Sequence, residues 1–93
     1  MRIAGYINHP KFKITIFKMD NRFTVKFEEG MLEQAYKFRS SDAIHSATDI
    51  RRLVDAEFLQ AVEAEMARQR RIHQAALDRL RPDGEEEEFE DII

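Results

Sequence analysis

The two segments that most constrain the fold are residues 12–16 and 23–27, in which apolar and polar side chains alternate. The apolar positions are Phe12, Ile14 and Ile16 in the first segment and Phe23, Val25 and Phe27 in the second. A two-residue repeat is typical of a β-strand that buries one face. Asp20 and Asn21 lie between the segments, and both residue types tolerate the positive φ angles of a two-residue turn. The pattern therefore predicts an antiparallel hairpin.

A turn at Asp20 and Asn21 also predicts which residues face each other. The predicted pairs are Ile16 with Val25, Ile14 with Phe27, Thr15 with Lys26, and Lys13 with Glu28. Apolar residues then meet apolar ones on one face, and lysine meets glutamate on the other. A shift of one residue would turn the apolar side chains toward solvent, so we expect this register to hold.

A second hairpin should follow the first. Glu29 and Gly30 are expected to form its turn, and residues 31–38 its strand. The predicted pairs are Phe27 with Leu32, Phe23 with Tyr36, and Lys26 with Glu33. Gln34 falls on the apolar face of this strand, where a polar side chain is unusual. Residues 3–7 are expected to add a further strand, either at the edge or in the middle of the sheet.

Residues 47–80 should form a single helix. Ser46 and Asp49 have the spacing of a capping box, in which both side chains bind free amides at the start of a helix. No Gly or Pro interrupts the sequence from there to Leu80. Such a helix would be about 45–50 Å long, whereas a strand of about eight residues spans about 27 Å. The helix must therefore break, protrude from the sheet or meet another chain.

The predicted fold is α+β: a three- to four-stranded antiparallel meander over residues 3–38, followed by one long C-terminal helix over residues 47–80. We expect one domain over residues 1–81 and a disordered acidic tail over residues 82–93, where seven acidic residues occur without a basic one. The net charge of −3 thus hides an acidic tail behind a sheet region that has more Lys and Arg than Asp and Glu.

The predicted helix carries two apolar patterns. Its first turns hold a broad stripe suited to covering a sheet, formed by Ile50, Leu53, Val54, Phe58 and Ala61. Alternating steps of three and four residues then mark a heptad pattern at Leu59, Val62, Met66, Gln69, His73, Ala76 and Leu80. One interpretation is that the second half pairs with a partner helix, through a dimer seam of Leu59, Val62, Met66, His73 and Leu80. The other is a helix that bends near Arg68, with the later spacing due to chance.

Residue types that carry catalysis or bind metals are sparse and scattered. His9, His45 and His73 lie on separate predicted elements, and no two of them stand four residues apart, as in a helical metal-binding pair. The chain has no cysteine, and its three glycines do not form a phosphate-binding loop. We therefore expect a protein that is not an enzyme and needs no cofactor or metal. No apolar segment is long enough for a membrane span or a signal peptide, so we expect a cytoplasmic protein without a membrane partner.

These patterns favour a small non-catalytic protein-interaction module that forms a homodimer, or that binds another protein. The alternative is a protein that binds single-stranded nucleic acid on the basic open face of its sheet. The residues predicted to form that face are Lys11, Lys13, Phe17, Arg22 and Lys26. Lysine and arginine neutralise phosphates, and an exposed aromatic ring can stack on a base. Glu28 and Glu33 share the face, as in a mixed-charge surface that is merely solvated or covered by a second subunit.

Two resemblances point toward single-stranded DNA. The predicted order over residues 1–80, a four-stranded antiparallel sheet and then a helix, resembles the folds of the Whirly, Pur-alpha and positive-cofactor transcription proteins, which implies a dimer that binds single strands. Residues 87–93, acidic with Phe89 and a terminal Ile92-Ile93, are similar to the C-terminal tips of bacterial single-stranded-DNA-binding proteins, although they lack that family's terminal Pro-Phe. This second resemblance implies a tail that docks into partner proteins and competes with DNA.

Overall fold

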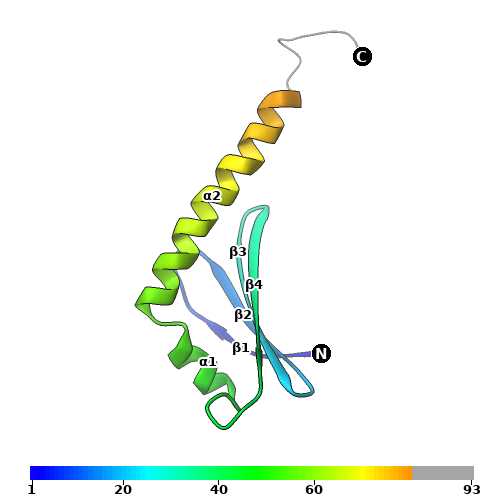
Figure 1. The fold of residues 1–93 in the computed structure, drawn as a ribbon, viewed down its shortest axis with the longest axis vertical. Coiled ribbons are helices and arrows are strands. Elements are labelled where there is room, and N and C mark those ends of the chain that lie inside the picture. The colour runs from blue at the N-terminus through cyan, green and yellow to red at the C-terminus, as the bar shows by residue number, and fades with distance from the viewer. Residues whose placement is uncertain (81–93) are drawn as a thin grey trace.

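A four-stranded antiparallel sheet is followed by two helices in the computed structural model, which describes residues 1–80 (Figure 1). The strands are β1 (Arg2–Ile7), β2 (Lys13–Met19), β3 (Arg22–Glu29) and β4 (Leu32–Arg39), and the helices are α1 (Ala47–Leu53) and α2 (Ala56–Leu80). Each strand pairs with the next, in the order β1-β2-β3-β4. The predicted α+β meander is therefore confirmed, with β1 at an edge of the sheet. The predicted acidic tail over residues 82–93 lies outside the described residues.

The hairpin of β2 and β3 has the predicted register. Its pairs include Ile16 with Val25, Ile14 with Phe27, Thr15 with Lys26, and Lys13 with Glu28. Asp20 opens the turn with a φ of 50°, a left-handed conformation that Asp reaches more readily than most residues. The alternation of side chains and the turn residues agree on one register, which explains why the sequence specifies this hairpin so well.

The predicted pairing of β3 with β4 is wrong by two residues. Gly30 and Met31 form the turn, since Glu29 pairs with Leu32. Gly30 has a φ of 61°, which glycine adopts without the steric cost of a side chain. The observed pairs include Phe27 with Gln34, Val25 with Tyr36, Phe23 with Phe38, and Lys26 with Ala35. A shift of two residues keeps every side chain on its predicted face, because the side-chain repeat of a strand is also two residues.

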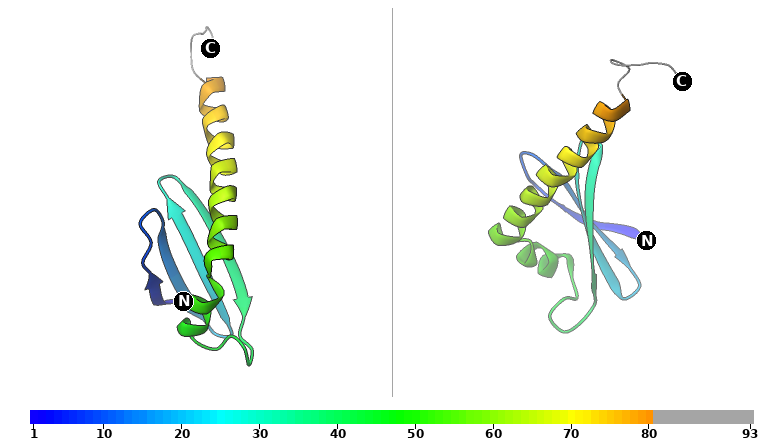
Figure 2. Two further views of the ribbon diagram at one scale, coloured as in Figure 1. Left: turned by 90° about the vertical axis from the view of Figure 1, so that its left-hand side faces the viewer. Right: turned by 45° about the horizontal axis from the view of Figure 1, so that its top comes forward.

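Both helices lie on the same side of the sheet, and the core forms between them and that side (Figures 1 and 2). The buried apolar residues are Phe12, Ile14, Ile16, Phe23, Val25, Phe27, Ile50, Val54, Val62 and Met66. Gln34 is buried with them, at 6% exposure. Its amide donates a hydrogen bond of 2.9 Å to the Val62 carbonyl, and its own carbonyl accepts one from the Tyr36 hydroxyl. These bonds replace water, so the glutamine is tolerated inside and fastens β4 to α2.

The prediction of one unbroken helix over residues 47–80 is wrong, because Val54 and Asp55 separate α1 from α2. Asp55 begins the new helix as its cap: its carboxylate accepts a hydrogen bond of 2.9 Å from the Phe58 N–H. From there α2 continues through Arg68 without interruption, so the break lies within the stripe that covers the sheet, at Val54 and Asp55, and not at Arg68.

The predicted cap at the start of α1 is confirmed. The Ser46 hydroxyl accepts a hydrogen bond of 3.3 Å from the Asp49 N–H. The Asp49 carboxylate in turn accepts one of 3.0 Å from the His45 N–H. That backbone donor holds the pKa of the Asp49 carboxyl below its usual value, with the Ser46 hydroxyl, the nearby His45 ring and Arg52 acting in the same direction. The ionised carboxylate is therefore part of the cap.

The C-terminal part of α2 extends past the sheet (Figure 2). Arg70 still reaches the sheet, where its guanidinium lies 2.6 Å from the Glu29 carboxylate beside the β3–β4 turn. Farther along, Ile72, Leu77 and Leu80 are 56%, 49% and 81% exposed. Of the three outcomes expected for a helix longer than the sheet, two occur: it breaks at Val54 and Asp55, and its C-terminal part protrudes from the sheet. Within residues 1–80, neither helix combines the length and the apolar character that crossing a membrane requires.

Candidate functional site

The side of the sheet opposite the helices, called here the open face, is uncovered by any element of residues 1–80 (Figure 1). Strand pairing arranges its side chains in four rows that cross the strands. From the β2–β3 turn upward the rows are Met19, Arg22 and Arg39; Ile3, Phe17, Thr24 and Lys37; Tyr6, Thr15, Lys26 and Ala35; and Lys13, Glu28 and Glu33. The apolar side chains of these rows lie mainly on β1 and β2, and the basic ones mainly on β3 and β4.

The β1 and β2 part of the open face is apolar. Ile3 is 49% exposed and Tyr6 is 54% exposed, and Phe17 of β2 is half-buried beside Ile3. The register of β1 against β2 shifts between Ile3 and Gly5, so Ile3 and Tyr6 share a face although three residues separate them. Thr15, by contrast, is buried in the row between Tyr6 and Lys26.

The β3 and β4 part of the open face is basic. Arg22, Lys26, Lys37 and Arg39 occupy three successive rows, and no carboxylate shares those rows. In the part of the chain that the structure describes, none of the four forms an ion pair. The Lys26 ammonium lies 5.5 Å from the centre of the Phe17 ring, a cation–π distance. Cations and aromatic surface therefore adjoin directly.

A shallow hollow joins the apolar and basic parts. Its volume is about 230 Å³, and its lining is Met1, Phe17, Met19, Arg22, Thr24, Lys26 and Lys37. Acidic residues are confined to the fourth row, where Glu28 and Glu33 lie beside Lys13 near the β3–β4 turn. The open face therefore has a basic and apolar end and a mixed-charge end.

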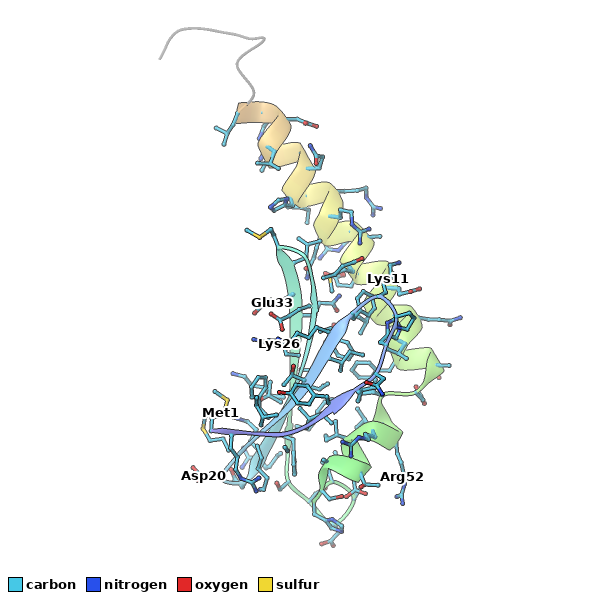
Figure 3. The ribbon with its side chains drawn as sticks, turned by 180° about the vertical axis from the view of Figure 1, so that it is seen from behind. Met1, Lys11, Asp20, Lys26, Glu33 and Arg52 are labelled. Atoms are coloured by element: carbon cyan, nitrogen blue, oxygen red, sulfur yellow. The ribbon has the colours of Figure 1, made fainter. Side chains whose placement is uncertain are left out.

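Four of the five residues predicted for a nucleic-acid face lie together on the open face: Lys13, Phe17, Arg22 and Lys26. Lys11 does not, so its prediction is wrong. It precedes β2 in a loop held by the His9 ring, whose Nδ1 accepts a hydrogen bond of 3.1 Å from the Lys11 N–H. Its ammonium lies 3.7 Å from the Glu63 carboxylate of α2, on the helix side of the sheet (Figure 3). The two-residue repeat of side chains begins only where β2 begins, at Lys13, so it does not predict on which side of the sheet Lys11 lies.

Sequence reasoning missed three residues of the open face. Ile3 and Tyr6 were not predicted for this face, because the register shift in β1 breaks the two-residue repeat of side chains and no turn residue marks the shift. Arg39 was not predicted for this face, because the strand was expected to end at Phe38; in the structure β4 continues to Arg39, which pairs with Arg22. Tyr6 matters most, because it adds an exposed aromatic ring to a face whose other ring, Phe17, is half-buried.

The residues of the predicted dimer seam are divided between two surroundings. Val62 and Met66 are each 1% exposed and belong to the core beneath α2, with Leu59 packed against it. His73 and Leu80 lie on the protruding part of α2 and are exposed. The chain's own sheet thus already covers the first half of the seam, which leaves only the protruding half for a partner helix.

Within residues 1–80, no three His, Asp or Glu side chains are grouped closely enough to hold a metal ion. No protein-family model, curated protein or solved structure matches this chain. The likeness in element order to single-stranded-DNA-binding folds therefore remains a resemblance, and no function passes to this chain from a relative.

Proposed function

We propose that this protein acts by binding single-stranded nucleic acid on the open face. The observation that carries the proposal is the arrangement of that face: exposed Tyr6 and half-buried Phe17 lie on one side, and four cations that form no ion pair within residues 1–80 lie on the other. This is the pair of features that single-strand binding requires, namely surfaces on which bases stack and charges that follow the phosphates.

Each part of the face has a task in the proposed complex. Bases would lie on Tyr6, Phe17 and the neighbouring Ile3, and each stacked base contributes about 1–3 kcal/mol. Phosphates would run along β3 and β4, near Arg22 and Lys37. A duplex keeps its base faces stacked inside, so it could use the cations but not the rings. Single strands are therefore the favoured ligand class.

A homodimer joined through the helix seam is the second candidate function, and it has weaker support. Val62 and Met66 are occupied by the sheet of the same chain. The remaining stripe, at His73 and Leu80, lies in a segment with four arginines and one aspartate over residues 68–80. Two such segments would repel each other, because like charges across an interface oppose association.

The test is a titration of fluorescently labelled oligonucleotides of about 12 nucleotides, a length within the span of common single-strand sites, followed by anisotropy at low salt. We expect the full chain to bind single strands more tightly than a duplex of the same sequence. Tyr6→Ala should weaken single-strand binding by about 1–3 kcal/mol and duplex binding much less.

Lys26→Ala and Lys11→Ala form a matched pair of variants. Both remove one lysine, but Lys26 lies on the open face and Lys11 beside Glu63 on the other side. We expect Lys26→Ala to weaken binding severalfold and Lys11→Ala to leave it nearly unchanged. Equal effects of the two variants, or no binding at low salt, would rule out the open face as the binding site.

A further inference from the structure

β4 is an edge strand whose protection against pairing with another chain is limited to its charged side chains, Glu33, Lys37 and Arg39. It pairs with β3 over eight residues without a register shift, and it contains no proline. β1, at the other edge, is shorter and is interrupted by the shift near Gly5. Edge strands expose unpaired N–H and C=O groups, and natural proteins usually interrupt or cover them. β4 is not interrupted, and no other strand of residues 1–80 pairs with its outer side.

The outward backbone groups of β4 can be assigned from the turn. A two-residue turn closes on a hydrogen-bonded pair, here Glu29 with Leu32, and such pairs alternate along an antiparallel ladder. The residues whose backbone groups point away from β3 are therefore Glu33, Ala35, Lys37 and Arg39. Their side chains all lie on the open face.

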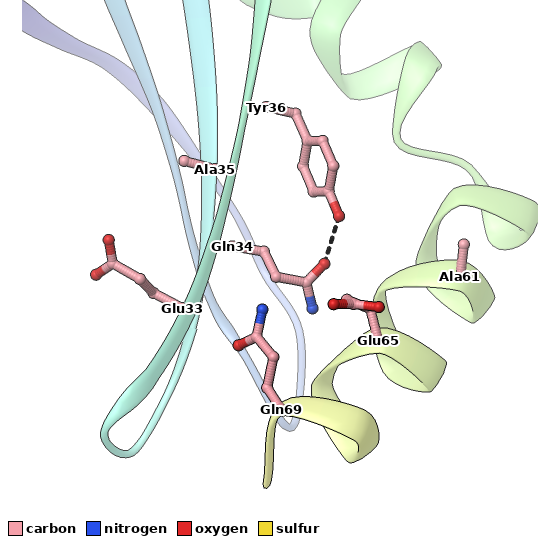
Figure 4. Close-up of a pocket in the computed structure, with 7 residues that line it drawn as sticks. All are labelled: Glu33, Gln34, Ala35, Tyr36, Ala61, Glu65 and Gln69. Atoms are coloured by element: carbon pink, nitrogen blue, oxygen red, sulfur yellow. Dashed lines mark hydrogen bonds between the residues drawn. The ribbon is translucent and has the colours of Figure 1, made fainter. Parts of the chain in front are cut away.

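A groove runs beside this edge, between β4 and α2 (Figure 4). One hollow of about 530 Å³ is lined by Glu33, Gln34, Ala35, Tyr36, Ala61, Glu65 and Gln69. A smaller one of about 140 Å³, lined by Tyr36, Phe58, Ala61 and Val62, continues the same groove. Burial and the Glu65 carboxylate raise the pKa of Tyr36, so its hydroxyl stays protonated and donates to Gln34. The edge is therefore bordered by a mainly polar hollow, which continues into a smaller apolar one at Phe58 and Val62.

The order of charges along β4 is self-complementary. If a second β4 runs antiparallel with Tyr36 opposite Tyr36, then Glu33 faces Arg39 twice and Ala35 faces Lys37 twice. A register centred on Lys37 would instead place two lysines opposite each other. One centred on Ala35 would leave Arg39 opposite Met31, which belongs to the turn. The Tyr36-centred register pairs opposite charges and stays within the strand.

We infer that a second copy of this chain docks along the β4 edge and forms a continuous eight-stranded antiparallel sheet about a twofold axis at Tyr36. The same patch serves both subunits, as a twofold interface requires. In this dimer the two open faces become one surface, and Arg39 of each copy neutralises Glu33 of the other. The inference does not depend on nucleic-acid binding.

The experiment is sedimentation equilibrium of the full chain at micromolar concentrations, with charge variants of the edge. Glu33→Arg alone and Arg39→Glu alone each place like charges in register, and each should raise the dimer Kd by about tenfold or more. The double variant Glu33→Arg with Arg39→Glu should restore dimerisation. Glu28→Arg is the control, because Glu28 faces Glu33 in the same row but belongs to the interior strand β3.

Hydrogen exchange locates the interface independently of these variants. The amides of Ala35 and Lys37 should exchange slowly at high protein concentration and faster on dilution. Sedimentation as a monomer up to about 100 μM would overturn the inference, because dimers held by an extended sheet edge should be populated well below that concentration. A dimer whose Kd does not respond to the single charge variants, or in which these amides exchange at the same rate at all concentrations, would overturn it as well.

Discussion

Replacing Met66 by Ala tests whether α2 covers the chain's own sheet or waits for a partner helix. The Met66 side chain is 1% exposed and its sulfur lies 3.8 Å from the Gln34 amide nitrogen. Truncation removes buried apolar surface and leaves a cavity, which at fully buried methionines costs about 2–5 kcal/mol. A domain of this size is stable by about 4–12 kcal/mol. The variant should therefore lose a large part of its free energy of unfolding.

The assay is urea denaturation followed by circular dichroism at one protein concentration, with Leu80→Ala as the matched control. Leu80 lies on the same stripe of α2 but is 81% exposed, so its truncation should change the free energy of unfolding by less than about 0.5 kcal/mol. Equal losses for the two variants would contradict the structure, because they would mean that a partner covers the whole stripe. A loss below about 1 kcal/mol for Met66→Ala would refute its burial against the sheet.

Three further changes probe the turn, the cap and the tail. Gly30→Ala should cost about 1 kcal/mol, measured by urea denaturation, because the φ of 61° strains any residue with a side chain and no other atom crowds the site. The lowered pKa of Asp49 means that its contribution is complete above about pH 4 and is lost as the pH falls through that lowered value, so helical circular dichroism should fall less steeply in acid for Asp49→Asn. Deleting residues 83–93, which hold seven acids and no base, should tighten oligonucleotide binding in the anisotropy titration if the tail competes for the open face.

The sheet could be predicted where two independent signals agreed. For β2 and β3, the side-chain alternation and the Asp20-Asn21 turn select the same register. For β3 and β4, the alternation is satisfied by either of two turns around Gly30, because they differ by two residues in pairing and keep the same faces. The choice between the two turns depends on the backbone conformation at Gly30, which the residue pattern does not specify.

The helix shows a different limit. The signal for its break was present in Asp55, a strong cap residue, but good helix formers on both sides outweighed it. The predicted dimer seam shows a further limit of sequence reasoning. Periodicity predicts that Val62 and Met66 lie on a buried stripe of the helix, but it does not predict whether the surface that covers them belongs to the same chain. The missed ring of Tyr6 depended on a register shift that leaves no mark in the residue pattern.

The most direct test of binding on the open face is the salt dependence of oligonucleotide affinity. Arg22, Lys26 and Lys37 form no ion pair within residues 1–80 and face no carboxylate in the inferred dimer, so they should contact about three phosphates. This predicts a slope of log K against log salt of about −2 for a single strand. Removing Arg22 should make that slope shallower by about 0.7, whereas Lys11→Ala should leave it unchanged. A slope near zero, or one that does not respond to Arg22→Ala, would contradict the account.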